Sequence, residues 1–366
     1  MKRGPFRLLL KALAPASLIL GVMVPGATGV TAAGAASRQT SATTPSKVWF
    51  LDLYYTDPFW QAATRGAQAA ATADHASFTQ VDANLSATSQ ANQFLSAETS
   101  GANVIELAAV DSKAAVHEIV TARKMGIKVC GLALGVAGTY VDATVELNEI
   151  GNGQFAANYI LSQAKKEGLK SINVVQIEVS LTTEAGRDRT SGFESVMKNP
   201  NPYGIHVHLV SKPALTPESA ATAFEDAATK TKFQAMFDQT DVFAPGIVPI
   251  LKRDGYTPTG GKNHMIWIGT GGIPTGLAAI RQHWQDASIN FPIDKIGAVC
   301  TLLMVGLRNG HSVRSSIAGV LKKEGLPAAT TKVTYPATGP IILPSPGLIT
   351  AANVNSKQWW ANQPHK

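Results

Sequence analysis

Cysteine and charge are both scarce in this sequence. Its 366 residues include only two cysteines, Cys130 and Cys300, and 16% charged side chains. Two cysteines are too few for a disulfide-rich scaffold or for a zinc site with four thiolates. Lys and Arg number 32 against 25 Asp and Glu, and four of the basic residues, Lys2, Arg3, Arg7 and Lys11, lie in the N-terminal segment that is expected to be removed. Without those four the balance is 28 against 25, which argues against a nucleic-acid-binding protein with a basic stripe.

Motifs of catalysis and metal binding are also missing. The sequence has no GxSxG elbow and no HExxH helix, and neither cysteine has a histidine in a recognisable nucleophile context. His206 and His208 fall on one face of an expected strand without an acidic or thiol partner nearby, so we expect no metal site. We therefore expect no enzymatic activity, no catalytic residue and no cofactor.

The N-terminus has the order of a secretory signal peptide. Four basic residues come first, an apolar run over 12–24 follows, and small residues fill 32–36. The apolar run is shorter than the ~20 residues of a membrane-spanning helix. We expect a signal peptide over 1–36, a flexible polar leader over 37–46, and an exported chain that is periplasmic or secreted. No cysteine lies near the cleavage zone, so no lipid anchor is expected.

The rest of the chain, 45% hydrophobic overall, alternates between short apolar strands and amphipathic helices. Strands are expected over 47–54, 78–83, 103–109, 127–134, 171–178, 205–211, 233–239, 264–270 and 286–291. Helices are expected over 58–73, 86–100, 112–125, 186–197, 217–232, 242–253 and 274–283. This alternation is typical of parallel sheets covered on both faces. The fold class is therefore α/β, with two similar series of strands that predict two doubly wound, Rossmann-like lobes.

Ligands of such sheets bind beyond the carboxyl ends of the strands. The first expected strand is followed by Asp57, Pro58, Phe59 and Trp60, so two adjacent aromatic rings stand at a strand exit. The rings either form a platform for a sugar or another small cyclic ligand, or they pack beneath the neighbouring loop. The residues alone leave these two interpretations equally open.

Short blocks of sequence carry a family resemblance. They follow one another in order along most of the mature chain: DPFW at 57–60, then 108–129, 146–160, 187–197, 235–255, 268–280, 291–297 and 346–354. In these blocks the chain resembles the type I periplasmic binding proteins of ABC transporters, in particular their ribose-binding-like sugar group. The resemblance implies two lobes that close on a small solute by hinge bending, and a closed form that a membrane ABC permease recognises.

The resemblance also implies a division of the chain. Lobe one comprises 47–146 and 293–325, lobe two comprises 147–292, and a C-terminal tail over 326–366 runs back along the hinge. Three crossings between the lobes are expected near 146–149, 239–241 and 290–292. The expected protein is a monomer.

Ligand contacts are implied residue by residue. Phe59 and Trp60 match the ring-stacking aromatics of the family, and Asp57 stands where a polar side chain is usual. Arg189 matches an arginine that donates to sugar oxygens from the second lobe, with Arg187 as the alternative if the register slips. The other expected contacts are Asn148, Thr240, Asp241, Asn290 and Phe291. For Asp241, a helix N-cap is the alternative.

Two departures from the family pattern concern carboxylates. Ala133 and Leu134 follow the fourth strand, where sugar binders usually present an acidic residue and often an arginine, and 269–272 is Gly-Thr-Gly-Gly where an aspartate is normal. Each lost charge-assisted hydrogen bond is worth about 1.5–3 kcal/mol. Either other groups replace the carboxylates, or the ligand has fewer hydroxyls, as Phe291 at a usually hydrogen-bonding position also indicates. The candidate replacements are Asp52, Tyr54, Tyr55, Tyr140, Glu184 and Asn290.

The expected function is an extracytoplasmic receptor that captures a sugar, a polyol or a similar solute and delivers it to an ABC permease. The alternatives are a sensory receptor of the same fold that signals to a membrane kinase or chemoreceptor, and a receptor for a non-carbohydrate. A transcription regulator of this fold is not expected, because 1–46 leaves no room for a helix-turn-helix. Cys130 and Cys300 both fall in lobe one, where two buried free thiols are favoured over a disulfide.

Overall fold

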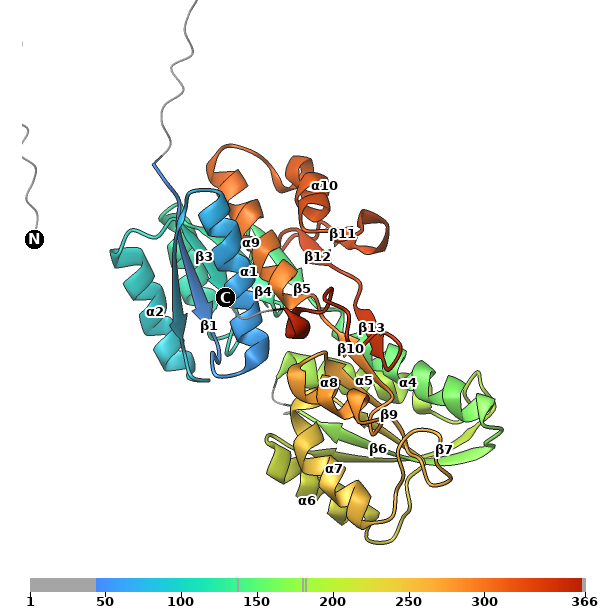
Figure 1. Cartoon of the computed structure of the whole chain (residues 1–366). Helices are drawn as coiled ribbons and strands as arrows, with labels where there is room; N and C mark the ends of the chain where they lie inside the picture. Colours follow the sequence, from blue (N-terminus) through green and yellow to red (C-terminus); the bar gives the residue numbers. More distant parts are fainter. Residues whose placement is uncertain (1–43, 137, 180, 182, 364–366) are drawn as a thin grey trace, which may run out of the picture. The chain divides into compact units, whose positions relative to one another are not determined.

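The structure is a computed structural model that describes residues 44–363, except 137, 180 and 182. The expected signal peptide and most of the expected leader lie outside the described residues. Within the described part, two β-sheets each have helices on both faces (Figure 1). No helix of this part combines the length and the apolar character that crossing a membrane requires. The α/β class with two parallel-sheet lobes is confirmed.

The first sheet has seven strands, which are parallel except for the pair β11–β12. Their order across the sheet is β11 (Lys332–Thr334), β12 (Ile341–Leu343), β5 (Ala143–Glu146), β4 (Lys128–Ala133), β3 (Val104–Leu107), β1 (Lys47–Asp52) and β2 (Ser77–Asp82). The helices of this lobe are α1 (Pro58–Ala73), α2 (Ala87–Thr99), α3 (Val116–Lys124), α9 (Ile293–Arg308) and α10 (Val313–Lys323). Alternate strand residues face opposite helix layers: Phe50 packs with the α1 and α9 side, and Leu51 with the α2 and α3 side.

The second sheet has six strands, of which only the pair β10–β13 is antiparallel. Their order is β13 (Gly347–Thr350), β10 (Ala287–Asn290), β9 (Ile266–Gly271), β8 (Ala235–Asp238), β6 (Ser171–Glu178) and β7 (His206–Pro213). Its helices are α4 (Glu149–Lys166), α5 (Glu184–Met197), α6 (Pro217–Ala228), α7 (Ala244–Arg253) and α8 (Pro274–Arg281). Figure 1 shows α6 and α7 on one face and α4 and α5 on the other.

Both sheets reverse their strand order at one point. Between β1 and β3 in the first sheet, and between β6 and β8 in the second, successive connections leave toward opposite faces. Helices on opposite faces leave a crevice at such a switch point, beyond the carboxyl ends of the strands. The topology therefore directs attention to the loops after β1, β3, β6 and β8.

The expected second crossing at 239–241 is wrong. β8 and β9 are neighbours in the second sheet, so the chain stays in one lobe there, because the segment between them supplies α7 to that same sheet. The chain changes sheets between β5 and α4, between β10 and α9, and again between β12 and β13.

Paired glycines let two pairs of helices approach closely. A Cβ on Gly66 of α1 would lie 1.7 Å from the carbonyl oxygen of Asp294 in α9, and one on Gly297 would lie 2.3 Å from that of Ala63. Helices α4 and α5 meet in the same way, because a Cβ on Gly153 would lie 2.1 Å from the Arg189 carbonyl oxygen. These contacts fix α1 and α5, the two helices that carry Phe59 and Arg189.

The two cysteines form a disulfide, so the expectation of free thiols is wrong. Cys130 on β4 and Cys300 on α9 are joined, with their Cα atoms 6.0 Å apart. The pairing follows from the packing of α9 against β4, which brings together two residues 170 positions apart in the sequence. Cα atoms at this separation have the usual geometry for a bridge.

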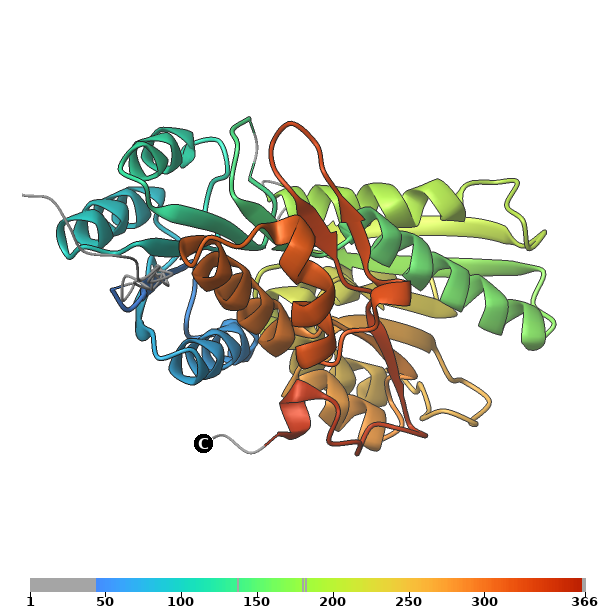
Figure 2. The same ribbon diagram turned by 90° about the horizontal axis from the view of Figure 1, so that it is seen from above.

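The C-terminal segment contacts both lobes. Trp359 packs with Leu277, Ile280 and Ile349 of the second lobe, while Trp360 belongs to the hydrophobic cluster that contains Phe291. Arg281 of α8 donates to the segment as well, and the red segment lies beside α8 in Figure 2.

Candidate functional site

The loop after β1 presents the first predicted site residues. Asp57 is the N-cap of α1, and its carboxylate accepts a 2.9 Å hydrogen bond from the backbone N–H of Phe59. Burial raises the pKa of Asp57, and this hydrogen bond lowers it in part. Trp60 is only 7% exposed and belongs to the core, whereas Phe59 stays half-buried. Of the two rings, Phe59 is therefore the more accessible one.

Phe59 stands at the centre of an aromatic cluster formed by Phe59, Trp60, Phe291 and Trp360. The centroid of its ring lies 5.2 Å from that of Trp60, 6.4 Å from Phe291 and 6.3 Å from Trp360. All three contacts are close to perpendicular, a geometry that contributes about 0.5–1.5 kcal/mol per pair beyond buried area. The cluster joins α1, the crossing segment after β10 and the C-terminal segment, and it holds the Phe59 ring in one orientation.

Arg189 reaches the cluster from the second lobe. Its Nε and Nη2 donate to the two carboxylate oxygens of Glu149 at 2.6 and 2.7 Å, and Nη1 donates to the Gln239 carbonyl oxygen at 2.7 Å. A guanidinium has five N–H donors, and these contacts use three of them. Its Cζ lies 5.6 Å from the ring centroid of Phe291. Arg187 instead donates to the Leu181 carbonyl oxygen and is exposed.

Two further predicted contacts cap helices. Asn148 is the N-cap of α4, where its side-chain oxygen accepts from the Gly151 backbone N–H at 3.0 Å, and its side chain is exposed. Thr240 follows β8 and its hydroxyl accepts from the Val242 backbone N–H at 3.4 Å. Both stand at the crossing or strand exits where the topology places a ligand.

Asp241 lies inside the second lobe and does not cap a helix. Its carboxylate accepts hydrogen bonds from Ser288 Oγ at 2.5 Å, Gln285 Nε2 at 2.8 Å and the Gly272 backbone N–H at 2.9 Å. Desolvation raises its pKa to about 7. The N-cap interpretation is wrong, because these donors turn the side chain toward the exit of β9. Asp241 therefore fixes the backbone of that exit.

The same hydrogen-bond network accounts for Gly-Thr-Gly-Gly at 269–272, where sugar binders of the family normally have an aspartate. A Cβ on Gly269 would lie 2.1 Å from Asp241 Oδ1 and 2.5 Å from Asp238 Oδ1. Both carboxyl groups are fully buried, and desolvation raises the pKa of each. The second lobe thus has its acidic groups beneath the strand exit, in the space that a side chain on Gly269 would need.

Among the candidate replacements, Asp52 is the last residue of β1 and Tyr54 lies in the loop just after it. The Asp52 carboxylate is fully buried and accepts from the Tyr54 backbone N–H at 3.1 Å, and burial raises its pKa to about 7. Tyr55 is 39% exposed in the same loop. Tyr140 precedes β5, and its ring centroid lies 4.3 Å from Cζ of Arg123 in the last turn of α3. It therefore stands near the amino ends of the strands, away from the strand exits. The side chain of Glu184 lies outside the described residues.

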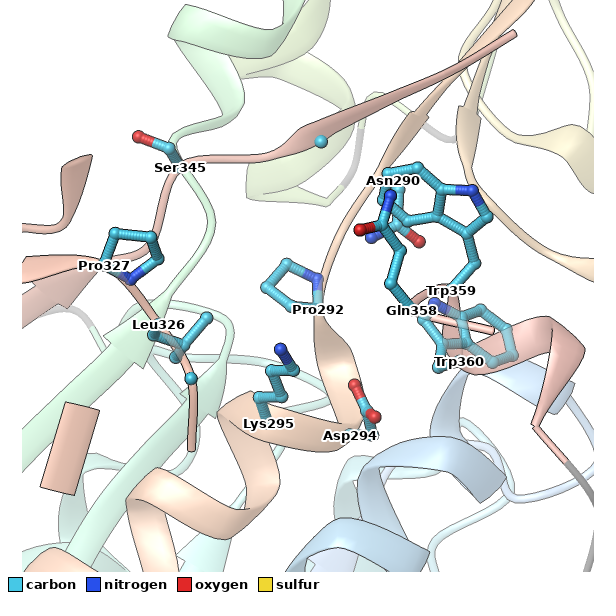
Figure 3. Close-up of a pocket in the computed structure, with 12 residues that line it drawn as sticks. Asn290, Pro292, Asp294, Lys295, Leu326, Pro327, Ser345, Gln358, Trp359 and Trp360 are labelled. Carbon is cyan, nitrogen blue, oxygen red and sulfur yellow. The ribbon is translucent and has the colours of Figure 1, made fainter. Parts of the chain in front are cut away.

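The side chains of Asn290 and Phe291 point in different directions. They are consecutive on an extended segment, so their side chains point to opposite faces. Phe291 faces the aromatic cluster, while Asn290 lines a cavity with residues of α9 and the C-terminal segment, including Trp360 of that cluster (Figure 3). Ala133, at the other departure, is buried at the end of β4 with a φ of 63°.

Comparison with known proteins identifies the family. A family model described as "Periplasmic binding protein domain" matches residues 50–312, well over half of the chain. The chain belongs to the type I periplasmic binding proteins. The ribose import binding protein of Haemophilus influenzae is 25% identical over 224 residues, which are 61% of this chain and 72% of the relative. Periplasmic binding proteins of this family are solute receptors and not enzymes, which confirms the expectation that no reaction is catalysed.

Solved structures of other solute-binding proteins share the fold. One from Mycobacterium smegmatis with bound glycerol is 20% identical, with a TM-score of 0.68 over 86% of this chain and 96% of the other. One from Bacillus halodurans with bound myo-inositol is 18% identical, with a TM-score of 0.69 over 87% and 99%. These identities support the architecture of the periplasmic binding protein and leave its own solute to be argued from its residues.

Three residues of this periplasmic binding protein were not predicted from the sequence. Glu149 and Gln239 hold Arg189, and Trp360 contacts Phe59. Glu149 and Gln239 lie in blocks that carry the family resemblance, but nothing in their spacing indicates a common partner. The adjacent pair Trp359–Trp360 is a signal that the sequence does contain, because two large apolar side chains in a polar tail indicate that the tail packs against the rest of the protein. In the described residues, no group of three or more His, Cys, Asp and Glu side chains is placed to hold a metal ion.

Proposed function

We propose that this periplasmic binding protein captures a sugar or a polyol between its two lobes and delivers it to an ABC permease. One observation carries the proposal: Phe59 of the first lobe and Arg189 of the second both contact Phe291 on the segment that joins them. An apolar ring and a cation with two remaining N–H donors, presented from different lobes, suit a solute with an apolar ring face and hydroxyl edges.

Closure on the solute follows from this division of contacts. A ligand favours the closed state only through interactions that it makes better in that state. Phe59 provides a stacking surface from the first lobe, and Arg189 provides hydrogen bonds from the second, so both contacts together require the lobes to close. Glu149 holds the guanidinium plane in advance, which reduces the entropy that binding costs.

The missing carboxylates favour a solute held by fewer charged groups than a pentose or hexose usually has. Asp52, with a carboxyl whose pKa burial raises to about 7, is the acidic group at the carboxyl end of β1. The solute-binding proteins with bound glycerol and myo-inositol, together with one from Actinobacillus succinogenes with bound D-allose, support polyols and sugars as the first compounds to test.

Export and partnership complete the proposal. The N-terminal signal sequence would direct the mature chain to the periplasm or the outside of the cell. There the protein would act as a monomer, and its closed form would be recognised by the permease. The domain boundaries at 147 and 293 would place the two lobes on either side of the hinge segments.

A thermal-shift screen of the mature protein tests the proposal. A ligand at 100 times its dissociation constant adds about 2.7 kcal/mol of stability, so true ligands raise the melting temperature clearly. The panel contains pentoses, hexoses, polyols, nucleosides, amino acids and small amines. We expect hits among sugars or polyols, and hits confined to the other classes would overturn the solute assignment.

Variants then test the site. Phe59→Ala and Arg189→Ala should each weaken binding of the hit more than tenfold in calorimetry. Arg187→Ala is the matched control, because this arginine on the same helix is exposed and bonds to Leu181. Wild-type affinity in both site variants would refute the site. Trp60→Ala is unsuitable, since removing a buried tryptophan costs about 3–5 kcal/mol of stability.

A further inference from the structure

The C-terminal segment, residues 351–363, is anchored on the second lobe. It follows β13, which pairs with β10 of that lobe. Arg281, the last residue of α8, donates to the side chains of Asn355 and Asn362 at 2.9 and 2.7 Å. Trp359 is only 8% exposed and packs in a hydrophobic cluster with residues of α8 and β13. Polar and apolar contacts together thus hold the segment against the second lobe.

The residues after Trp359 reach the first lobe. Trp359 has an extended backbone, with φ −81° and ψ 127°, and the side chains of Trp359 and Trp360 leave the segment in different directions (Figure 3). Trp360 is 2% exposed and packs in the cluster that contains Phe59 of α1. The side-chain amide of Gln363 donates to the Asp294 carboxylate of α9 at 3.4 Å. The segment therefore bridges the two lobes.

The bridge ends on the ring that the proposed function uses for stacking. The centroids of the Trp360 and Phe59 rings lie 6.3 Å apart, and the ring planes meet at 76°. Such an edge-to-face contact is directional, so it orients the Phe59 ring. Because Trp360 is carried by a segment anchored on the second lobe, rotation of one lobe against the other changes this contact. A solute stacked on Phe59 and a particular arrangement of the lobes are thereby linked.

We propose that the C-terminal segment is a tether through which the second lobe positions the Phe59 ring, with Trp360 as the positioning residue. The inference rests on the proposed function, in which the solute stacks on Phe59. Trp359 holds the tether and Trp360 acts at its end, so the loss of either side chain releases the ring. Neither tryptophan has to touch the solute, since both are almost completely buried.

The ring signals of Phe59 in the solute-free mature protein test the tether. Selective ¹³C labelling of phenylalanine makes the ring visible by NMR, and Phe59→Leu identifies its signal by the loss. We expect Trp359→Ala to shift or broaden this signal, although Trp359 packs in a different cluster from Phe59. Arg281→Ala removes only hydrogen bonds of an exposed side chain, so it leaves the core intact and should give a smaller change.

Arg253→Ala is the matched control for Arg281→Ala. This exposed arginine is the last residue of α7 and pairs with Glu225 and Asp254. The control should leave the Phe59 signal as it is in the wild type. A Phe59 signal that is unchanged in both Trp359→Ala and Arg281→Ala, or that changes equally in Arg253→Ala, would overturn the tether.

Calorimetry with the solute found in the screen tests the positioning role. Trp359→Ala and Trp360→Ala should each weaken binding about fivefold or more, the lower end of ordinary coupling between sites. Trp360→Phe should stay close to wild type, because it keeps an aromatic ring beside Phe59. Wild-type affinity in Trp359→Ala, or an equal loss in Trp360→Phe and Trp360→Ala, would overturn this role. A screen without hits would refute the proposed function alone, because the Phe59 signal decides the tether without any solute.

Discussion

Arg189 and Glu149 form a two-point ion pair, with the guanidinium Nε and Nη2 at 2.6 and 2.7 Å from the two carboxylate oxygens. The pair joins the first turn of α4 to α5, whose close approach the glycines of both helices permit. A charge-assisted pair of this geometry fixes the plane of the guanidinium as well as its position. In the proposed function, Glu149 thus acts on the solute through Arg189 as a positioning residue.

Glu149→Gln should therefore weaken solute binding about tenfold. The amide retains one acceptor for Arg189 but loses the charge and the second acceptor, so the guanidinium plane is no longer fixed. Calorimetric titration with the solute found in the screen measures the change. Glu225→Gln is the control, because Glu225 pairs with exposed Arg253, and exposed pairs contribute little. Wild-type affinity in Glu149→Gln would contradict the positioning role.

The stability of the fold should fall as pH rises from about 4.5 to 8. Burial raises the pKa of Glu106 from 4.5 to about 8, and that of Asp52 from 3.8 to about 7. The unfolded chain releases both protons near the ordinary pKa values, whereas the folded chain keeps that of Asp52 up to about pH 7 and that of Glu106 up to about pH 8, so the folded state binds more protons and loses stability as pH rises. The loss is on the order of 1 kcal/mol per pH unit for each group.

Urea unfolding at pH 5, 6, 7 and 8 measures this slope. Glu106→Gln should make the slope less steep and leave the contribution of Asp52, because the amide does not ionise and can still accept the hydrogen bond from Thr301. Stability that is constant or that rises over the window would show that these carboxyl groups are ionised in the folded protein.

Reduction of the Cys130–Cys300 bond should lower stability by about 2–5 kcal/mol. The bond closes a loop of 170 residues, and long loops lose the most entropy in the unfolded chain. Thermal unfolding with and without reductant measures the effect, and the double variant Cys130→Ala/Cys300→Ala should not respond to reductant. Two reactive thiols in the denatured but unreduced protein would contradict the bond.

Gly269→Ala should destabilise the second lobe by more than 2 kcal/mol. The new methyl group would collide with the Asp241 and Asp238 carboxyl groups, and neither can move without breaking its hydrogen bonds. Gly319→Ala on α10 is the matched control, because no atom lies within 4 Å of its added Cβ. The control should gain about 1 kcal/mol from helix propensity. Equal melting temperatures for the two variants would refute the role given to Gly269.

Local signals in the sequence predict most of the fold. The helix expected over 58–73 is α1 with the same bounds, because Asp57 and Pro58 form its start. The strand expected over 171–178 is β6 with the same bounds, because its apolar run is continuous. Four short strands, β5, β11, β12 and β13, were not expected, since none exceeds four residues and each depends on a partner strand from elsewhere in the chain. The helices α4 and α10 were not among the expected helices either.

Long-range pairing is what the sequence could not show. Cys130 and Cys300 meet because α9 packs on β4, and Asp241 turns away from its own helix because Gln285, Ser288 and Gly272 offer donors. The sequence does not distinguish the roles of Phe59 and Trp60, and only the packing of the folded chain makes Trp60 a core residue. The contribution of Trp360 also depends on where the C-terminal segment returns.

The bond between Cys130 and Cys300 has a topological consequence. The residues between them include β6 to β10, five of the six strands of the second sheet. The second lobe is thus largely contained in a covalent ring that is closed within the first lobe. A protease that cuts once inside this ring linearises it without releasing a fragment. Such a nicked molecule would migrate as one chain in a denaturing gel until reductant separates its two pieces.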